Sequence, residues 1–210
     1  MNIAPLLITP AILALGSTAH LAAADRLPSW DLRGHLGGAP GIDSFDGTSV
    51  EANGGTTFDI GVVYTHPFHQ QFGVIANAGL FSTQHKADVE GFAGELSYQA
   101  VGIDLGFGLA YFASERTTIE ARLIGAFGSG KGNDIVTGSD TYTDDGGAYR
   151  SLGMAVGALY TFGGGFQIGG ELRYTKATGA TDYTLQGQSQ DSGDVEAAGP
   201  SLGISLGFRF

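Results

Sequence analysis

Apolar and polar residues alternate with a period of two through most of this sequence. The last ten residues, SLGISLGFRF, carry apolar side chains at every second position up to the terminal Phe210, which gives an extended strand one apolar face, because successive strand side chains point to opposite faces. Eight stretches show this pattern rather than helical spacing, and they predict eight β-strands. The stretches are 30–37, 56–65, 72–82, 98–112, 117–128, 148–162, 166–176 and 200–210.

The connections between these predicted strands alternate between short and long. The short ones are HPFHQQ, ASER and GGG, and the long ones cover 38–55, 83–97, 129–147 and 177–197. Strict alternation between antiparallel strands places every tight turn at one end of a barrel, every long loop at the other, and both termini at the turn end. Parts of the long loops, such as TDYTLQ at 181–186, are expected to continue as β-ribbon.

The ionisable side chains of the predicted strands share a face with most of the strand glycines. In a soluble barrel the apolar face would fill the interior and the polar face would meet water. A solvated face gains nothing from glycine, which weakens strands, whereas the narrow interior of an eight-stranded barrel needs small residues between its few large polar ones. We therefore predict that the apolar face meets lipid and that charges and glycines line the lumen.

Six charged residues of this predicted lumen are expected to form a network. Glu120 and Arg122, like Glu171 and Arg173, are two positions apart and so lie on one face, at a comparable distance from their turns. Buried charges are costly unless they pair, which favours a network that plugs the lumen. The alternative is a gate or narrow ion path that opens when pairs switch. The six residues are Asp59, Asp104, Glu120, Arg122, Glu171 and Arg173.

Aromatic residues gather near both ends of the predicted strands, which is typical of membrane barrels. The apolar face also carries two clearly charged residues, Arg150 and Lys176, beside long loops, where we expect them to reach lipid head groups. At the turn side the aromatic residues are Trp30, Tyr64, Phe68, Phe72, Tyr111, Phe162, Phe166, Phe208 and Phe210, and at the loop side they are Tyr98, Phe127, Tyr149 and Tyr174. We therefore expect two aromatic girdles.

The N-terminal segment indicates export. Residues 1–24 combine an apolar centre with three terminal alanines, as in a secretory signal peptide, although no Lys or Arg precedes the centre. An uncleaved anchor is the alternative, and Pro5 and Pro10 disfavour it. We expect a signal peptide over 1–24 and one barrel domain over 25–210. The absence of cysteine from the sequence excludes disulfides and cysteine–zinc sites.

The charge of the chain is concentrated in the long connections. The formal net charge of −11 argues against nucleic acid as a partner. The four long connections contribute −3, −2, −3 and −4, or −12 together, and should favour cations or a basic partner. Their charged residues are Asp43, Asp46, Glu51, Lys86, Asp88, Glu90, Glu95, Lys131, Asp134, Asp140, Asp144, Asp145, Asp182, Asp191, Asp194 and Glu196.

Motifs for chemistry are weak. The segment GAFGSGKG at 125–132 has the lysine of a phosphate-binding loop but a glycine where Ser or Thr is needed. The acidic segment DTYTDDGG at 140–147 lacks calcium-loop spacing, so solvated surface charge is the preferred interpretation. Among the five histidines only His35 shares the predicted lumen with carboxylates. We expect no cofactor, no metal and no enzymatic activity, and a membrane-embedded lipid hydrolase is the least favoured alternative.

The alternation that ends in Phe208 and Phe210 resembles the assembly signal of Gram-negative outer-membrane barrels. From about residue 28 to 210 the chain resembles the small eight-stranded family of the OmpA transmembrane-domain, OmpX and opacity-protein type. The resemblance implies an all-β, transmembrane, eight-stranded antiparallel up-and-down β-barrel with short periplasmic turns and long extracellular loops. It also implies export through the periplasm, contact with outer-membrane lipid and lipopolysaccharide, and assembly by the barrel-assembly machinery through the C-terminal strand.

The function expected from these patterns is that of a surface protein in the outer membrane. Its lumen would be closed by the charged network, and its acidic extracellular loops would act in envelope stability, adhesion or interaction with a host or surface partner. A narrow porin-like channel for small solutes or ions is the alternative. Fold alone does not decide between them.

Overall fold

The computed structural model describes residues 26–88, 95–137, 140–185 and 188–210, so the predicted signal peptide lies outside the described residues. These described residues form twelve strands, and no helix among them is long and apolar enough to span a membrane. The strands are β1 (Ser29–Ala39), β2 (Ile42–Phe45), β3 (Thr48–Ser49), β4 (Glu51–Pro67), β5 (Phe72–Asp88), β6 (Glu95–Phe112), β7 (Thr117–Gly132), β8 (Ile135–Thr137), β9 (Asp140–Asp144), β10 (Gly147–Thr161), β11 (Phe166–Leu185) and β12 (Gln188–Arg209).

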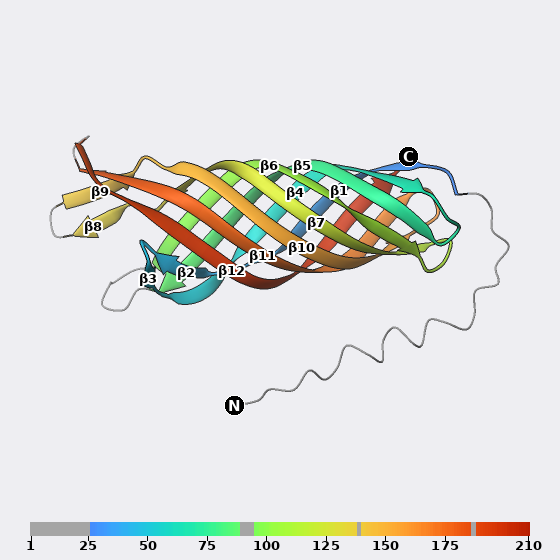
Figure 1. Cartoon of the computed structure of the whole chain (residues 1–210), viewed down its shortest axis with the longest axis horizontal. Helices are drawn as coiled ribbons and strands as arrows, with labels where there is room; N and C mark the ends of the chain where they lie inside the picture. Colours follow the sequence, from blue (N-terminus) through green and yellow to red (C-terminus); the bar gives the residue numbers. More distant parts are fainter. Residues whose placement is uncertain (1–25, 89–94, 138–139, 186–187) are drawn as a thin grey trace, which may run out of the picture.

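Eight of these strands close into a ring, in the order β12, β1, β4, β5, β6, β7, β10 and β11, with β11 paired to β12 (Figure 1). All eight neighbouring pairs are antiparallel, which confirms the predicted up-and-down barrel. The last strand closes the ring against the first, and the Phe210 amide donates to the Trp30 carbonyl at 3.0 Å. The C-terminal strand therefore has no free edge, as its two-faced pattern requires.

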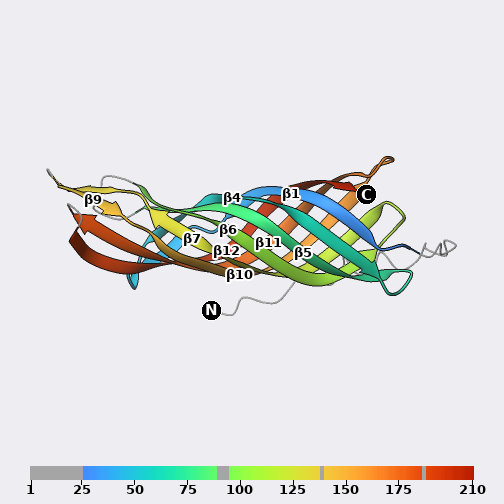
Figure 2. The ribbon, with the colours of Figure 1, turned by 90° about the horizontal axis from the view of Figure 1, so that it is seen from above.

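The wall strands extend at their loop ends well beyond the alternating stretches of the sequence. The β11 strand has 20 residues and β12 has 22, whereas about 9–11 residues suffice to cross a bilayer. Most of the predicted loop 177–197 is therefore strand, and Figure 2 shows this ribbon extending away from the end that holds the C-terminus. Apolar alternation ends where the wall leaves the apolar band, so the sequence pattern detected only the part of each strand inside it.

Two small hairpins add to this long-stranded end. The β2 and β3 strands are joined at Asp46 and Gly47, with φ of 47° and 73°, the left-handed conformations of a two-residue hairpin turn that suit Asp-Gly. The β2 strand pairs with β12 above the point where β1 has ended. The β9 strand pairs with β8 and, through Asp144 and Thr143, with β11. Together they broaden the loop end into a β-platform.

The apolar face of the wall points outward. Ile103 and Leu105 on β6 are 51% and 52% exposed, whereas the carboxylates Glu120 and Glu171 are 3% and 5% exposed. A soluble barrel would have the reverse arrangement, so the predicted orientation is confirmed. The turn-side girdle also lies outward, since Trp30, Phe68, Phe72, Phe162, Phe166, Phe208 and Phe210 are exposed.

The loop-side girdle is only half as predicted. Phe127 and Tyr174 are exposed on the outer surface, but Tyr98 and Tyr149 point into the barrel, where they are 1% and 5% exposed. Leu152 is the first residue of the outward apolar row of β10, and Tyr149 lies three positions before it, on the opposite face of the strand. The parity of the strand thus sends Tyr149 inward, and the assignment of both tyrosines to the girdle was wrong.

Candidate functional site: the filled lumen

Strand register brings the predicted lumen charges to common levels. Glu120 on β7 and Glu171 on β11 both lie opposite Gly157 of β10, and one step further Arg122 and Arg173 both lie opposite Ala155. Small residues on the intervening strand leave room for long side chains from both neighbours. The two acid–arginine pairs therefore meet across β10 inside the barrel.

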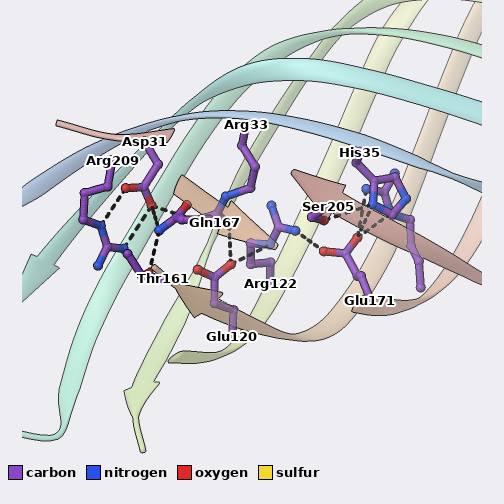
Figure 3. A network of polar contacts seen from close by, with 11 residues as sticks. Asp31, Arg33, His35, Glu120, Arg122, Thr161, Gln167, Glu171, Ser205 and Arg209 are labelled. Atoms are coloured by element: carbon purple, nitrogen blue, oxygen red, sulfur yellow. Dashed lines mark hydrogen bonds and ion pairs between the residues drawn. The ribbon is translucent and has the colours of Figure 1, made fainter. Parts of the chain in front are cut away.

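The charges form a continuous chain of alternating sign, which we call the ion ladder. Arg173 contacts Asp59 at 2.8 Å and Glu171 at 3.0 Å, and Glu171 also accepts from Arg122. Arg122 lies 3.7 Å from Glu120, and Glu120 accepts from Arg33 at 2.7 Å. Figure 3 shows most of the chain running along the lumen. Its eight members, four carboxylates and four guanidinium groups, are Asp59, Arg173, Glu171, Arg122, Glu120, Arg33, Asp31 and Arg209.

The turn end of the ladder joins the first and last strands. Asp31 on β1 is fully buried and accepts from Arg33 at 2.8 Å and from Arg209 of β12 at 2.8 and 3.1 Å. Gln167 donates to the same carboxylate at 3.4 Å and to Thr161 at 3.2 Å. The ladder thus reinforces the pairing that closes the ring.

Asp104, the sixth predicted member, lies in the lumen outside the ladder. Its Oδ2 accepts from the Asn77 amide at 2.9 Å, and no ion pair joins it to an arginine among the described residues. The Oδ1 atoms of Asp104 and Asn77 are buried without a protein partner. A polar cavity of about 40 Å³ touches both residues, which is room for a few water molecules.

His35 meets both a serine and a carboxylate in the lumen. Its Nδ1 lies 3.3 Å from the Ser205 hydroxyl and 3.9 Å from Glu171 Oε1 (Figure 3). A catalytic triad needs the serine on one ring nitrogen and the acid on the other, whereas here both contacts converge on Nδ1. Glu171 is moreover engaged by two arginines. The three residues are near one another without the geometry of a nucleophilic site.

Lumen glycines make space for large inward side chains. A Cβ on Gly203 would lie 2.4 Å from the His35 ring, and a Cβ on Gly130 or Gly179 would lie within 2.5 Å of Tyr98. Contacts this short do not occur between real side chains, so the rings fit only because the facing residues are glycine. This close approach explains why the charged face is also rich in glycine.

An apolar layer, which we call the apolar cap, fills the loop-side part of the barrel. Tyr149 packs between Phe81, with ring centroids 5.4 Å apart, and His85, at 5.9 Å. The cap was missed by the sequence reasoning, which assigned the interior to polar and small residues. The remaining buried members are Ile42, Ala87, Leu96, Tyr98, Ala100, Ala126, Ala177, Val195 and Ala197.

Two hydrogen bonds position the cap ring of His85, which lies beyond the apolar band. Its Nδ1 is 2.8 Å from the Pro40 carbonyl and its Nε2 is 3.2 Å from the Tyr149 hydroxyl. Because a carbonyl only accepts, Nδ1 carries the proton and Nε2 accepts from Tyr149. Burial lowers the pKa of His85, and burial raises the pKa of Tyr149 to about 12. Both groups are therefore neutral at physiological pH.

Small cavities lie between the cap and the ladder in the part of the barrel that the structure describes. A cavity of about 40 Å³ is bounded by Phe81 and Tyr149 on the cap side and by Asp59 and Arg173 on the ladder side. It is similar in size to the cavity beside Asp104. Each has room for a few water molecules. The lumen is thus occupied by side chains along the ladder and the cap.

The acidic segment at 140–147 is built differently from a solvated loop. Asp144 is fully buried, and its carboxylate accepts from the backbone amides of Gly132, of Gly146 at 2.8 Å and of Asp182 at 2.7 Å. It fastens β7, β9 and β11 together, so the solvated interpretation was wrong for this residue. No group of three or more metal-ligating side chains occurs among the described residues.

The rest of the loop end is strongly acidic on its surface. Eight exposed carboxylates lie on it among the described residues, where Lys131 is exposed and Lys86 is half-buried. Asp43 also accepts from the Ala198 amide at 2.7 Å. We call this set the acidic platform, and its carboxylates are Asp43, Asp46, Glu51, Asp88, Asp134, Asp145, Asp194 and Glu196.

Comparisons with known proteins identify the family. Residues 9–210 match the family model described as outer membrane protein beta-barrel domain. No curated protein matches the chain. Similar solved structures include Ail, the attachment invasion locus protein of Yersinia pestis, at 14% identity and a TM-score of 0.45, covering 87% of this chain and 99% of that chain.

OprG from Pseudomonas aeruginosa is 13% identical with a TM-score of 0.47, covering 88% of this chain and 97% of that chain. AlkL, solved in lipid bilayers, is 17% identical with a TM-score of 0.47, covering 90% and 93%. The family match, in contrast, spans nearly the whole sequence. The chain therefore belongs to the outer membrane protein β-barrel domain family, and it is an integral β-barrel protein of the outer membrane.

Proposed function

We propose that this protein is a non-conducting anchor that presents the acidic platform at the cell surface. The observation that carries the proposal is the filled lumen, in which the ion ladder and the apolar cap follow one another along the barrel. A barrel that does not conduct acts through what it displays. Its platform suits envelope stability, adhesion or interaction with a basic partner.

The ladder supports closure on energetic grounds. Each internal carboxylate of the chain contacts two guanidinium groups, as Glu171 does with Arg122 and Arg173. Opening a path would separate such pairs, and an unpaired buried charge costs about 3–5 kcal/mol. The narrow-channel alternative needs this cost to be met at every opening. The apolar cap adds a second barrier, because ions do not cross a dry apolar layer readily.

Planar-bilayer recording tests closure. The wild-type protein is expected to give no steady openings at moderate voltage in KCl. Steady openings whose amplitude changes in Glu120→Gln, but not in the exposed turn variant Glu115→Gln, would instead establish the channel. Glu115 is a matched control because it is an exposed acid at the turn end, outside the ladder.

Binding of a basic probe tests the role of the platform. Cells that carry the wild-type protein should bind a fluorescent oligolysine peptide, and binding should weaken as salt rises. The combined variant Asp46→Asn, Glu51→Gln, Asp88→Asn and Asp194→Asn should lose most of this binding, whereas Glu115→Gln should keep it. Equal binding by the combined variant and the wild type would refute the proposal.

Export and assembly form part of the same proposal. We propose that residues 1–24 are removed as a signal peptide, which leaves a mature barrel over 25–210. Phe208 and Phe210 would serve as the assembly signal, and both are exposed at the turn-side rim, in reach of an assembly partner. N-terminal sequencing of the protein from outer membranes tests the cleavage, since a sequence starting at Met1 would contradict it.

The enzyme alternative has little support. The Ser205–His35–Glu171 group lacks triad geometry, and Glu171 is itself a member of the ion ladder. We propose that the protein has no catalytic role. Lipid analysis of membranes with and without the protein tests this, and a deacylated lipid that appears only with the protein would contradict it.

A further inference from the structure

The outer wall of the barrel has a hollow across three neighbouring strands within the apolar band. A groove of about 590 Å³ crosses β7, β10 and β11, and its walls include Leu123, Phe127, Leu152 and Met154. The residue at its floor is Gly125, which lies opposite Leu152 in the sheet. The groove is apolar over most of its length and opens on the face that meets hydrocarbon.

Two cations stand at the platform-side end of this groove. Arg150 and Lys176 both line it, and they are diagonal neighbours across β10 and β11, since Arg150 lies opposite Thr178. Diagonal neighbours of this kind are about 7–8 Å apart along the backbone. The side chains can therefore converge on one group.

Neither cation has an anionic partner in the part of the protein that the structure describes. Among the described residues no carboxylate forms an ion pair with Arg150 or Lys176, although Arg150 donates to the Thr178 hydroxyl at 3.1 Å. Like charges side by side on a sheet destabilise it unless an anion lies between them. The chain has a net charge of −11 and only 10 Lys and Arg residues, so two adjacent unpaired cations on the lipid-facing wall call for an external anion.

We propose that this groove binds one phosphorylated acyl lipid of the outer leaflet, of the lipid A kind. The phosphate is held between Arg150 and Lys176, with the Thr178 hydroxyl beside it, and an acyl chain lies over Gly125. The occupant follows from the combined chemistry, because a phosphate alone would not need the apolar groove and a neutral lipid would not need the cations. A bound lipid would thereby cover one side of the wall directly below the acidic platform.

The glycine floor permits a direct test of the acyl part. A Cβ on Gly125 would meet the Phe127 ring at 3.8 and 3.9 Å and the Ser151 carbonyl oxygen at 4.0 Å, which are ordinary contacts. Gly125→Leu therefore fills the groove without a backbone clash. Gly34→Leu is the matched control. Gly34 also faces outward, and a Cβ there would have its closest neighbour at 3.8 Å, but Gly34 lies on β1 and not on one of the groove strands.

The experiment is native mass spectrometry of the full barrel, folded in phosphatidylcholine bicelles and titrated with defined lipid A or with dephosphorylated lipid A. The wild type should retain one lipid A per barrel. Arg150→Gln and Lys176→Gln should each weaken retention about fivefold, and the double variant about 25-fold. Arg116→Gln, an exposed cation at the turn end, and the conservative Lys176→Arg should bind as the wild type does. Heat-dependent gel mobility verifies that each variant is folded.

Three results would overturn the proposal. One is equal retention of lipid A by the wild type and the double charge variant, and another is equal retention of phosphorylated and dephosphorylated lipid. The third is a barrel dimer that Gly125→Leu abolishes, which would make a second copy of the chain the occupant of the groove. Weaker lipid A retention in Gly125→Leu than in Gly34→Leu supports the acyl contact.

Discussion

Replacement of Glu171 by glutamine tests the ion ladder at its centre. Glu171 is almost fully buried and contacts Arg122 and Arg173. Glutamine keeps the shape but removes the charge, so the four guanidinium groups of the ladder then face three carboxylates. Leaving a buried charge without its partner costs about 3–5 kcal/mol. We expect the free energy of unfolding to fall by about this amount.

The double variant Arg122→Gln with Glu171→Gln separates charge balance from simple loss of contacts. In it Glu120 keeps Arg33, and Arg173 keeps Asp59, so each remaining charge has a partner. The double variant should therefore be less destabilised than Glu171→Gln alone, and a double-mutant cycle should give a coupling free energy above about 0.5 kcal/mol.

Urea-induced unfolding from lipid vesicles provides the assay, with fluorescence of the single tryptophan as the signal. Trp30 lies exposed at the turn-side rim of the wall, so its emission should change when it leaves the bilayer. Glu115→Gln serves as the control and should stay within about 0.5 kcal/mol of the wild type. A Glu171→Gln effect below about 1 kcal/mol, or strict additivity in the cycle, would refute the ladder as a paired network.

Three further predictions concern the two ends of the barrel. Burial lowers the pKa of His85 below its ordinary 6.5, so the unfolded chain binds more protons near that pH and the free energy of unfolding should fall as pH drops through about 6.5. The urea midpoint should therefore change less between pH 8 and pH 5 in His85→Gln than in the wild type, and an equal change in both would contradict this. Asp144→Ala should make the β-platform sensitive to added protease on whole cells, because three backbone amides lose their acceptor, whereas Asp145→Ala should not. Equal resistance of the two variants would contradict the role of Asp144 in joining β7, β9 and β11. Phe210→Ala should lower the yield of heat-modifiable barrel far more than Phe162→Ala, and equal yields would argue against the assembly signal.

The barrel itself could be predicted from the sequence because membrane burial imposes a period of two on every strand. The lengths of the connections predicted which end of the barrel holds the tight turns. The charged residues were assigned to the lumen because they lie at alternate positions of the strands, on the same face as most of the strand glycines. Parity also placed Glu120 and Glu171 in the lumen. Pattern rules succeed here because lipid outside and a narrow interior select opposite side chains.

Other features depend on register between strands, which one sequence does not specify. The ion ladder from Asp59 to Arg209 forms only because β10 brings Arg122 level with Arg173. Glu120 and Arg33 lie far apart in the sequence, so no local pattern predicts that they pair. The apolar cap was missed because, beyond the lipid, either face of a strand can be apolar or polar, so the alternation no longer tells the inner face from the outer one. Tyr149 was therefore assigned to the aromatic girdle. A count of parity from Leu152 would have placed it inward.

Hydrocarbon surrounds the wall while side chains fill the lumen, and thiol accessibility at two neighbouring positions distinguishes this arrangement from an open or an inverted barrel. The chain has no cysteine, so Ala155→Cys and Val156→Cys each introduce a single thiol, the first at a buried inward position and the second at an exposed outward one. In lipid vesicles the Val156→Cys thiol should react with a lipid-soluble maleimide only, and the Ala155→Cys thiol should react with neither that reagent nor a water-soluble one. Reaction of the Ala155→Cys thiol with the water-soluble reagent would reveal an open lumen, and its reaction with the lipid-soluble reagent would reverse the orientation of the wall.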